Sequence, residues 1–180
     1  VAATFCPLCN AAIVFDRRID DQVLDFGTTG NLRFSDLVMY DRQTESWWQQ
    51  FTGEGIVGGF TGAQLTIIPS RVEPFGLFAA AFPDADILQR PPGFPRNYGV
   101  NPYDSYDTSD APLFPGIPLP EGIAPMAYVV AVGDQAWTLD RLKAEKRIEA
   151  GDLVLTWESG QLSVLDIAYI KEGRDIGYVT

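Results

Sequence analysis

The chain contains no histidine among its 180 residues. Histidine supplies the base of Ser-His-Asp triads and Cys-His pairs, and its imidazole is a common ligand of zinc, copper and haem. Every mechanism that needs an imidazole from this chain is therefore excluded. Chemistry must come from thiols, carboxylates, arginine, tyrosine or backbone groups.

Positive charge and long apolar runs are also scarce. Lysine and arginine total 13 against 24 aspartate and glutamate residues, which gives a formal net charge of -11. A field of this sign repels phosphate backbones and anionic lipid surfaces, so nucleic acid is not an expected partner. The longest apolar run, residues 75–82, is too short to span a bilayer, which takes about 18 residues or more. No membrane insertion is expected within the chain.

The composition favours a globular protein. Hydrophobic residues make up 46% of the chain and charged residues 21%. A chain of this size and composition can bury roughly 70% of its unfolded surface around one core, so residues 1–180 are expected to form a single domain. The sequence begins at Val1, already inside a strand-like run and without a signal-peptide pattern, so we expect that it was processed or truncated at its front.

The first 71 residues carry strand signals. Residues 1–5 and 11–16 are apolar runs on either side of the cysteines, and Pro7 removes a backbone donor where the first strand should end. From residue 23 to residue 71, short apolar runs alternate with the turn-like stretches GTTG, DRQTES, TGEG and GGFTG, a pattern typical of an antiparallel meander. The DRQTES turn should place Tyr40 beside Trp47 or Trp48 across a hairpin.

The rest of the chain mixes helix, loop and strand signals. Helices are predicted over residues 73–82 and 140–147, the second capped by Asp140. Most of the 13 prolines lie between Pro91 and Pro125, where they predict an extended surface loop. Further strands are predicted at residues 85–90, 127–132, 136–139, 152–157, 161–166 and 176–179. The predicted fold class is α+β and β-dominated, with antiparallel meander sheets, two short helices and a long proline-rich loop.

The two cysteines of the chain, Cys6 and Cys9, lie in the stretch TFCPLCNAAIVFD. In a strand they would be about 10 Å apart, whereas a disulfide requires Cα atoms roughly 4.4–6.8 Å apart. The segment must therefore turn, and Pro7 suits the second position of such a turn. In a loop of this kind, backbone N–H groups and the neighbouring thiol can stabilise a thiolate and lower the pKa of a cysteine.

Three interpretations of the cysteine pair remain open. The first is thiol–disulfide oxidoreductase-like chemistry on an unknown protein or a small thiol or disulfide, with Cys6 as the more exposed attacking thiol and Cys9 as the resolving thiol. The second is a soft-metal site for Cu(I), completed by Met39, Met126, a partner chain or an exogenous ligand. The third is a structural disulfide in a non-catalytic extracellular module for binding or assembly. No other cofactor is predicted.

Polar groups beside aromatic residues provide further candidates for substrate binding. Four residues on the two arms of the predicted hairpin can line a shallow pocket near the thiols: Asp41, Arg42, Trp48 and Gln50. Tyr103 and Tyr106 can cover the same place from the long loop. The alternative for all six is structural, because such residues also serve in turns, in the core or on a solvated surface.

Several stretches together resemble the family called domain of unknown function 3179. They are TFCPLCNAAIVFDR, LDFGTTGNLRFSDLVMYDRQTESWWQQFTGEGIVG, YGVNPYDSYD, VVAVGDQAWTL and LSVLDIAYIKEGRDIGYV. The resemblance implies a bacterial or archaeal protein, exported or membrane-anchored, with no established activity. Some members of the family carry selenocysteine in the Cys-x-x-Cys position, which implies redox chemistry at Cys6 or Cys9.

The resemblance also bears on location and partners. Members usually have a further region before the cysteine motif, so this chain is expected to lack an upstream part of the family domain. Its sheet would then have an open edge beside residues 1–5, through which a partner or a second copy of the chain can pair. The implied location is extracytoplasmic, which means periplasmic, on the cell surface or secreted.

Overall fold

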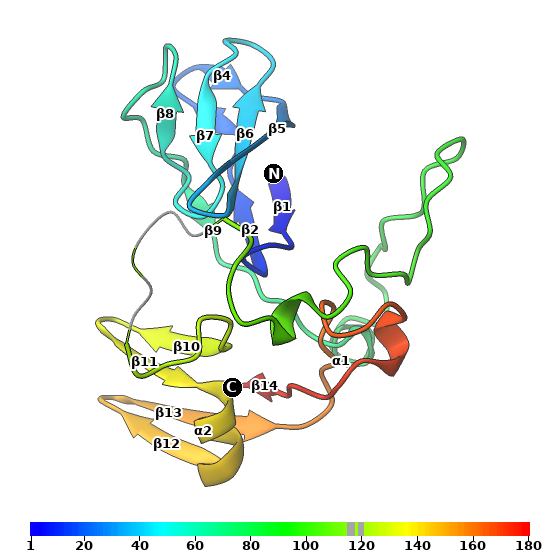
Figure 1. Ribbon diagram of the computed structural model, residues 1–180. Helices are drawn as coiled ribbons and strands as arrows, with labels where there is room; N and C mark the ends of the chain where they lie inside the picture. The colour runs from blue at the N-terminus through cyan, green and yellow to red at the C-terminus, as the bar shows by residue number, and fades with distance from the viewer. Residues whose placement is uncertain (115–117, 119–120) are drawn as a thin grey trace. The chain divides into compact units, whose positions relative to one another are not determined.

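The computed structural model describes residues 1–114, 118 and 121–180, and Figure 1 shows its strands and helices. The chain divides into two compact units, Val1–Val72 with Ala111–Gly122 and Glu73–Asp110 with Ile123–Thr180. The expectation of a single domain stays a prediction. Residues 115–117 and 119–120 of the predicted proline-rich loop lie outside the described residues.

The first unit begins with a three-stranded antiparallel sheet in the order β1-β2-β9. Its strands are β1 (Ala2–Cys6), β2 (Ala11–Phe15) and β9 (Ile67–Ile68). Side chains of β1 alternate between the interior and solvent, as expected for a strand with one buried face, and Cys6 at its end pairs with Ala11. The strands predicted at residues 1–5 and 11–16 are confirmed.

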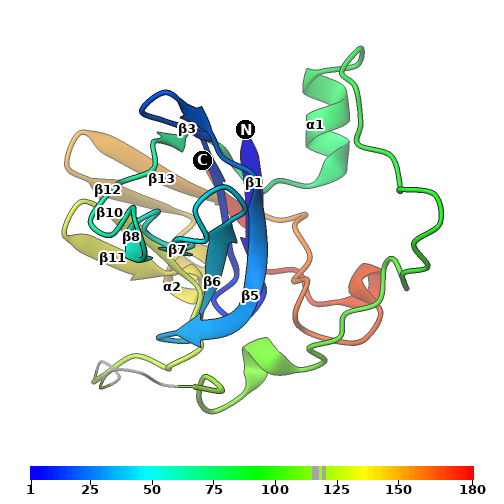
Figure 2. The same cartoon turned by 90° about the horizontal axis from the view of Figure 1, so that it is seen from above.

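A four-stranded meander in the order β5-β6-β7-β8 follows in the same unit. Its strands are β5 (Phe26–Arg33), β6 (Asp36–Asp41), β7 (Trp47–Gln49) and β8 (Gly55–Val57), while β3 (Arg18–Ile19) and β4 (Gln22–Val23) form a separate hairpin. Tyr40 pairs with Trp47, which confirms the predicted hairpin. The prediction of a turn at GTTG is wrong, because these residues lie inside β5, which Figure 2 shows as one long strand. The register of β5 with β6 shifts between Thr28 and Leu32.

The core of the first unit consists of five side chains that are at most 2% exposed: Phe15, Leu24, Met39, Trp48 and Leu65. Trp48 meets Phe26 edge to face, with ring centroids 6.0 Å apart. Burying a side chain of this size contributes roughly 1.5–3 kcal/mol. This core holds together β2, β6 and β7, the strands whose ends carry the cysteine loop and its surroundings.

The second unit combines two helices with short sheets. Its elements are α1 (Phe75–Ala81), β10 (Val129–Val132), β11 (Gln135–Thr138), α2 (Leu139–Glu145), β12 (Arg147–Ala150), β13 (Leu153–Glu158) and β14 (Tyr178–Val179), with 3-10 turns at Tyr106–Thr108 and Ile170–Glu172. Its core is Trp137, Leu142, Ile148, Ala150, Leu155 and Trp157. The β-dominated α+β class with two short helices is confirmed. In the described part of the chain, no helix has the length and apolar character needed to cross a bilayer.

The second predicted helix differs from the structure at both ends. Its N-cap is Thr138, whose side chain accepts a hydrogen bond from the Arg141 N–H at 3.2 Å, so the prediction of Asp140 as the cap is wrong. The helix ends at Lys146, which takes a φ of 65° and reverses the chain. Arg147 therefore begins β12 and does not belong to the helix.

Two predicted strands of the second unit do not form. Residues 85–90 are exposed and irregular. Residues 161–166 make only an isolated bridge, between Leu162 and Asp175. Within that stretch Ser163 and Asp166 direct their side chains to distant polar partners, which replaces the strand ladder with a bent backbone.

Candidate functional site

The Cys-Pro-Leu-Cys loop joins β1 to β2 and folds back on itself. The Asn10 N–H donates to the Pro7 carbonyl at 3.3 Å, and Asn10 has a left-handed φ of 48°. The Cys9 sulfur lies 3.8 Å from the carbonyl oxygen of Cys6. Both cysteines are free thiols. The predicted turn is confirmed, since an extended chain would carry Cys9 away from Cys6.

A carboxylate from another part of the first unit lies against the pair. Asp36 begins β6, directly after a turn in which Phe34 and Ser35 adopt φ values of 55° and 62°. The Cys9 thiol donates to Asp36 Oδ1 at 3.1 Å. The two sulfurs and a carboxylate oxygen of Asp36 all lie within 4.8 Å of one another. We call this group the dithiol–carboxylate cluster; it consists of Cys6, Cys9 and Asp36.

The scaffold fixes the orientation of the Asp36 carboxylate. Its second oxygen, Oδ2, accepts hydrogen bonds from the Phe51 N–H at 2.9 Å and from the side-chain amide of Gln49. Asp36 is only 5% exposed. Since these two donors occupy Oδ2, the other oxygen is left for Cys9. Sequence reasoning missed Asp36, and the only available signal was an acidic residue at the start of the apolar run LVMY.

The two thiols have different pKa values because the ionisation of one opposes the ionisation of the other. The side-chain interaction with the Cys9 thiol lowers the pKa of Cys6 from 9.0 to about 7; burial opposes this shift, and the backbone N–H groups of Cys9 and Leu37 support it. The pKa of Cys9 is raised well above its usual value by the hydrogen bond with Cys6, by burial and by the bond to Asp36. Near neutral pH the pair therefore loses one proton easily and retains the other.

The exposure of the two sulfur-bearing residues is the reverse of the expected order. Cys6 is 1% exposed, whereas Cys9 is half-buried. The expectation that Cys6 is the more exposed thiol is therefore wrong. The reason is its place on β1, where Cys6 belongs to the buried face of the strand while Cys9 lies on the loop beyond it. Cys9 is therefore the more accessible of the two residues.

Three residues predicted to line a substrate pocket make scaffold contacts. Asp41 is fully buried and accepts a hydrogen bond from Trp48 Nε1 at 2.9 Å, and Trp48 is itself in the core. The buried amide of Gln50 donates to Thr4 Oγ1 at 2.8 Å and to the Ala11 carbonyl at 3.1 Å. Gln50 thus ties together the two strands that flank the cysteine loop. A role of these side chains in substrate binding stays a prediction.

The other three predicted binding residues occupy different places. Arg42 is exposed, stacks on the Tyr40 ring at 5.5 Å and lines a groove of the first unit. Tyr103 and Tyr106 belong to the second unit, where their rings lie 6.3 Å apart and Tyr106 is buried. Their predicted role in covering the thiols stays a prediction.

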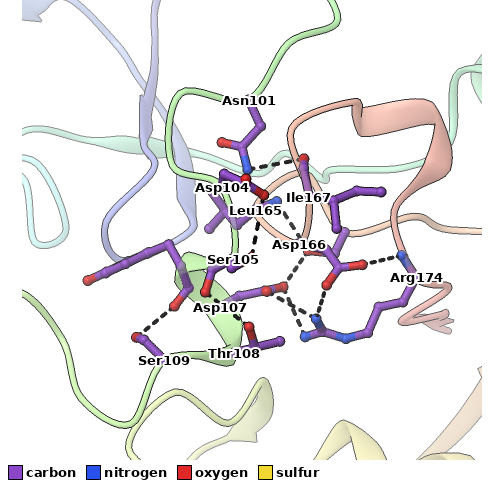
Figure 3. A network of polar contacts seen from close by, with 12 residues as sticks. Asn101, Asp104, Ser105, Asp107, Thr108, Ser109, Leu165, Asp166, Ile167 and Arg174 are labelled. Carbon is purple, nitrogen blue, oxygen red and sulfur yellow. Dashed lines mark hydrogen bonds and ion pairs between the residues drawn. The ribbon is translucent and has the colours of Figure 1, made fainter.

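A partly buried ion-pair network lies in the second unit and was also missed by sequence reasoning (Figure 3). The Asp107 carboxylate accepts hydrogen bonds from both Nη atoms of Arg174, at 3.0 and 2.9 Å, and from Tyr128 and Ser163. Arg174 also pairs with Asp166 at 2.7 Å. Burial, the largest cause, raises the pKa of Tyr128 to about 12. Because the Asp107 oxygens bond to partners within the unit, we interpret this network as a structural clamp.

Among the described residues, the dithiol–carboxylate cluster brings its ligand atoms close enough together to hold a metal ion. Met39, one proposed additional ligand, is 2% exposed and packs in the core of the first unit. Met126, the other, belongs to the second unit. The cluster itself offers two sulfurs and one carboxylate oxygen, and a contribution from either methionine stays a prediction.

Comparison with known proteins gives one match. The model of a family described as protein of unknown function (DUF3179) matches residues 1–180. Neither the curated proteins nor the solved structures include a match to the chain.

Proposed function

The chain belongs to the DUF3179 family of proteins of unknown function, and from its thiol geometry we propose that it exchanges disulfides with dithiol partners through Cys6 and Cys9. The observation that carries this proposal is the pairing of a buried thiol of lowered pKa with a half-exposed thiol. A purely structural pair would need neither the acidity difference nor the access. A disulfide closed over so short a loop also adds little stability.

The exchange follows from the exposure of the two residues. In the disulfide form, a partner thiolate attacks the Cys9 sulfur, a new S–S bond joins Cys9 to the partner, and the Cys6–Cys9 bond breaks. The bonding electrons leave with Cys6 as a thiolate. A second partner thiolate then attacks the partner sulfur of the mixed disulfide, and Cys9 leaves and takes up a proton. The partner dithiol has become a disulfide, and two electrons have passed to the cysteine pair.

The lowered pKa of Cys6 favours this direction of exchange. A thiol that is readily ionised is the better leaving group, and it stabilises the reduced pair relative to the disulfide. The protein then acts as an oxidant of dithiols, and a disulfide compound in its surroundings restores the Cys6–Cys9 bond by the reverse steps. Such chemistry suits an oxidising compartment, which agrees with the extracytoplasmic location that we propose.

Asp36 has a defined role in this scheme. When Cys9 acts as a nucleophile in the reverse reaction, its thiol must lose a proton, and Asp36 Oδ1 lies in hydrogen-bond contact with that thiol. The carboxylate also makes both thiols harder to ionise through its negative charge. Asp36 thus acts as a positioning and proton-accepting residue beside the sulfurs.

Equilibration in glutathione redox buffers tests the proposal. After acid quenching and alkylation of free thiols, mass spectrometry should show a two-electron transition between dithiol and disulfide, with a midpoint in the range of about -270 to -120 mV that exchange proteins occupy. Cys6→Ser and Cys9→Ser should each abolish the two-electron step. A pair that stays fully reduced or fully oxidised across this range would refute the proposal and leave the structural alternative, a binding or assembly module.

A metal site is the second candidate function, and the compact geometry of the dithiol–carboxylate cluster favours it. Thiolates favour Cu(I), whereas a mixture of thiolate and carboxylate ligands suits Zn²⁺. Three protein ligands leave a fourth position open for a further ligand.

Titration of each ion into the reduced protein under anaerobic conditions tests this candidate. Cu(I) binding should produce thiolate-to-metal absorption that is lost in the Cys6→Ser/Cys9→Ser variant. Asp36→Asn should weaken Zn²⁺ binding more than Cu(I) binding, because only Zn²⁺ draws strongly on the carboxylate. Equal binding of both ions by the wild type and the double variant would exclude a metal site at the cluster.

A further inference from the structure

The unpaired edges of two strands border one groove in the first unit. Among the described residues, β1 pairs only with β2, and β5 pairs only with β6. A groove of about 520 Å³ is lined by residues 1–5 of the β1 segment and by residues 26–28 of β5. Figure 2 shows the two strands side by side. The groove therefore runs between two backbone edges that each lack a second neighbour.

The register of the sheet decides which groups of β1 face the groove. The Asp16 N–H bonds to the Thr66 carbonyl, which directs the even-numbered residues of β2 toward β9. The odd-numbered residues of β2 then bond to the even-numbered residues of β1. Ala3 and Phe5 consequently turn their N–H and C=O groups to the open edge.

The same alternation applies to β5. The Arg42 N–H bonds to the Asp25 carbonyl, so in this part of β5 the odd-numbered residues bond to β6. Phe26 and Thr28 therefore direct their N–H and C=O groups away from β6. Both residues line the groove. Backbone donors and acceptors thus stand along both of its sides, and an extended polypeptide is the ligand that matches them.

The groove has two chemically different ends. At one end, Arg17 pairs with Asp25 at 2.7 Å, which brings the start of β5 close to the Val1 end of β1. At the other end, Phe5 and Leu37 line the groove, and they are the chain neighbours of Cys6 and Asp36. The two strands consequently run in the same direction, and the groove leads to the dithiol–carboxylate cluster.

We propose that this groove binds an extended segment of a partner protein as a strand between β1 and β5, with a cysteine of that segment placed at the Cys6–Cys9 pair. The inference rests on the proposed function and names its substrate class, a cysteine-bearing polypeptide in place of a small thiol. At roughly 3.3 Å per residue, about five residues of the segment fill the groove.

The lining also specifies side chains of the segment. Phe26 and Leu37 line the groove with partly exposed apolar side chains, which suits apolar residues at alternate positions. Arg17 and Arg42 line it too, and Arg17 Nε is buried without a hydrogen-bond partner. Asp25 also lines the groove and pairs with Arg17, so the two guanidinium groups and this carboxylate leave an excess positive charge there. In a chain of net charge -11, this excess favours an acidic residue at the end of the segment remote from its cysteine.

Two synthetic peptides probe the groove in its two directions. Acetyl-Cys-Val-Thr-Val-Thr-Glu-amide would lie antiparallel to β1, and acetyl-Glu-Thr-Val-Thr-Val-Cys-amide would lie parallel to it. Mixed-disulfide formation with the oxidised protein is followed by mass spectrometry, with glutathione as the small thiol for comparison. One of the peptides should react at least about tenfold faster than glutathione, a gain equivalent to about 1.4 kcal/mol.

A matched pair of variants isolates the backbone bonds. Ala3→Pro removes an N–H from the open edge without removing a bond to β2, and Ala3→Ser keeps that N–H. The peptide should lose its advantage in the proline variant and keep it in the serine variant, while the glutathione rate stays unchanged in both. Peptides N-methylated at their valines test the same bonds without altering the protein, and they should react no faster than glutathione.

The results separate this inference from the proposed function. Unchanged peptide rates in Ala3→Pro and with N-methylated peptides would overturn the groove while leaving disulfide exchange intact. If neither glutathione nor peptide exchanges, the proposed function fails. Peptide binding in the groove is then tested separately, with a labelled peptide that carries Cys→Ser. Its binding to the wild-type protein is followed by fluorescence anisotropy, and absence of binding would overturn the groove. A dimer that pairs through β1 and is not dissociated by the peptide would also overturn it.

Discussion

The thiol of Cys9 donates a hydrogen bond to Asp36 at 3.1 Å, across 27 residues of sequence. The contact joins the loop after β1 to the first residue of β6. Because Asp36 is held by Gln49 and Phe51, it cannot turn away from the sulfur without breaking two further hydrogen bonds. The carboxylate that makes both thiols harder to ionise thus depends for its position on the meander sheet.

Asp36→Asn should make the thiols more acidic. The substitution keeps the shape of the side chain and removes the negative charge that opposes ionisation of both cysteines, so the pKa of Cys6 should fall below about 7 and that of Cys9 should also fall. Ultraviolet absorbance of the thiolate as a function of pH measures the change. Asp20→Asn, at an exposed turn position, is the control and should leave the titration unchanged. A titration identical to the wild type in Asp36→Asn would contradict the contact.

Stability should rise between about pH 7 and pH 9 through Cys6. The folded pKa of Cys6 is lowered to about 7 from 9.0, so in this window the unfolded chain binds more protons and folding gains free energy as pH increases. The gain is on the order of 2 kcal/mol, and it is lost again as pH falls through 7. Cys9 acts oppositely above pH 9, because its pKa is raised in the fold. Urea unfolding of the reduced protein at several pH values should show this rise, and Cys6→Ser should flatten it.

Trapping experiments should distinguish the accessible thiol from the buried one. Cys6→Ser leaves the half-buried Cys9, which is expected to form a mixed disulfide with oxidised glutathione in the native state. Cys9→Ser leaves Cys6 at 1% exposure, so its reaction must await local opening. We expect it to be at least about tenfold slower, equivalent to an opening free energy of about 1.4 kcal/mol. Faster reaction of Cys6 in the native state would reverse the proposed order of attack.

Gln50→Ala should weaken the support beneath the cysteine loop. The variant loses hydrogen bonds to Thr4 and to the Ala11 carbonyl, which is left buried, and the expected loss of unfolding free energy is about 1–3 kcal/mol. Denaturant unfolding measures it, with the exposed Gln22→Ala as the control. If both variants unfold alike, Gln50 has no supporting role.

Asp107→Asn should destabilise the second unit. It removes the charge that pairs with Arg174 and one acceptor oxygen for the hydroxyls of Tyr128 and Ser163. Since Arg174 remains 39% exposed, the expected cost is about 2–3 kcal/mol, at or below the lower end of the range for breaking a fully buried pair. Asp104→Asn, on an exposed neighbour in the same loop, is the matched control, and thermal unfolding should separate the two variants.

Local patterns predicted most of the first unit. The apolar runs around the cysteines, the Tyr40–Trp47 hairpin and the need for a turn at Pro7 each depend on residues close together in sequence, where side-chain alternation and turn chemistry decide the backbone. The GTTG stretch shows the limit of this reasoning. Glycine and threonine there suggested a turn, yet pairing with β6 draws them into a strand with a register shift.

The sequence by itself determined that the two sulfur atoms would be neighbours, because Cys6 and Cys9 are three residues apart and Pro7 bends the chain between them. It also determined that no imidazole from this chain would accompany them, because the sequence contains no histidine. Tertiary structure alone decided that Asp36 is the carboxylate beside them, that Cys6 is buried and Cys9 accessible, and that Asp107 pairs with Arg174 across 67 residues. Contacts of this kind depend on how separate strands and loops pack together, and no short stretch of sequence encodes that packing.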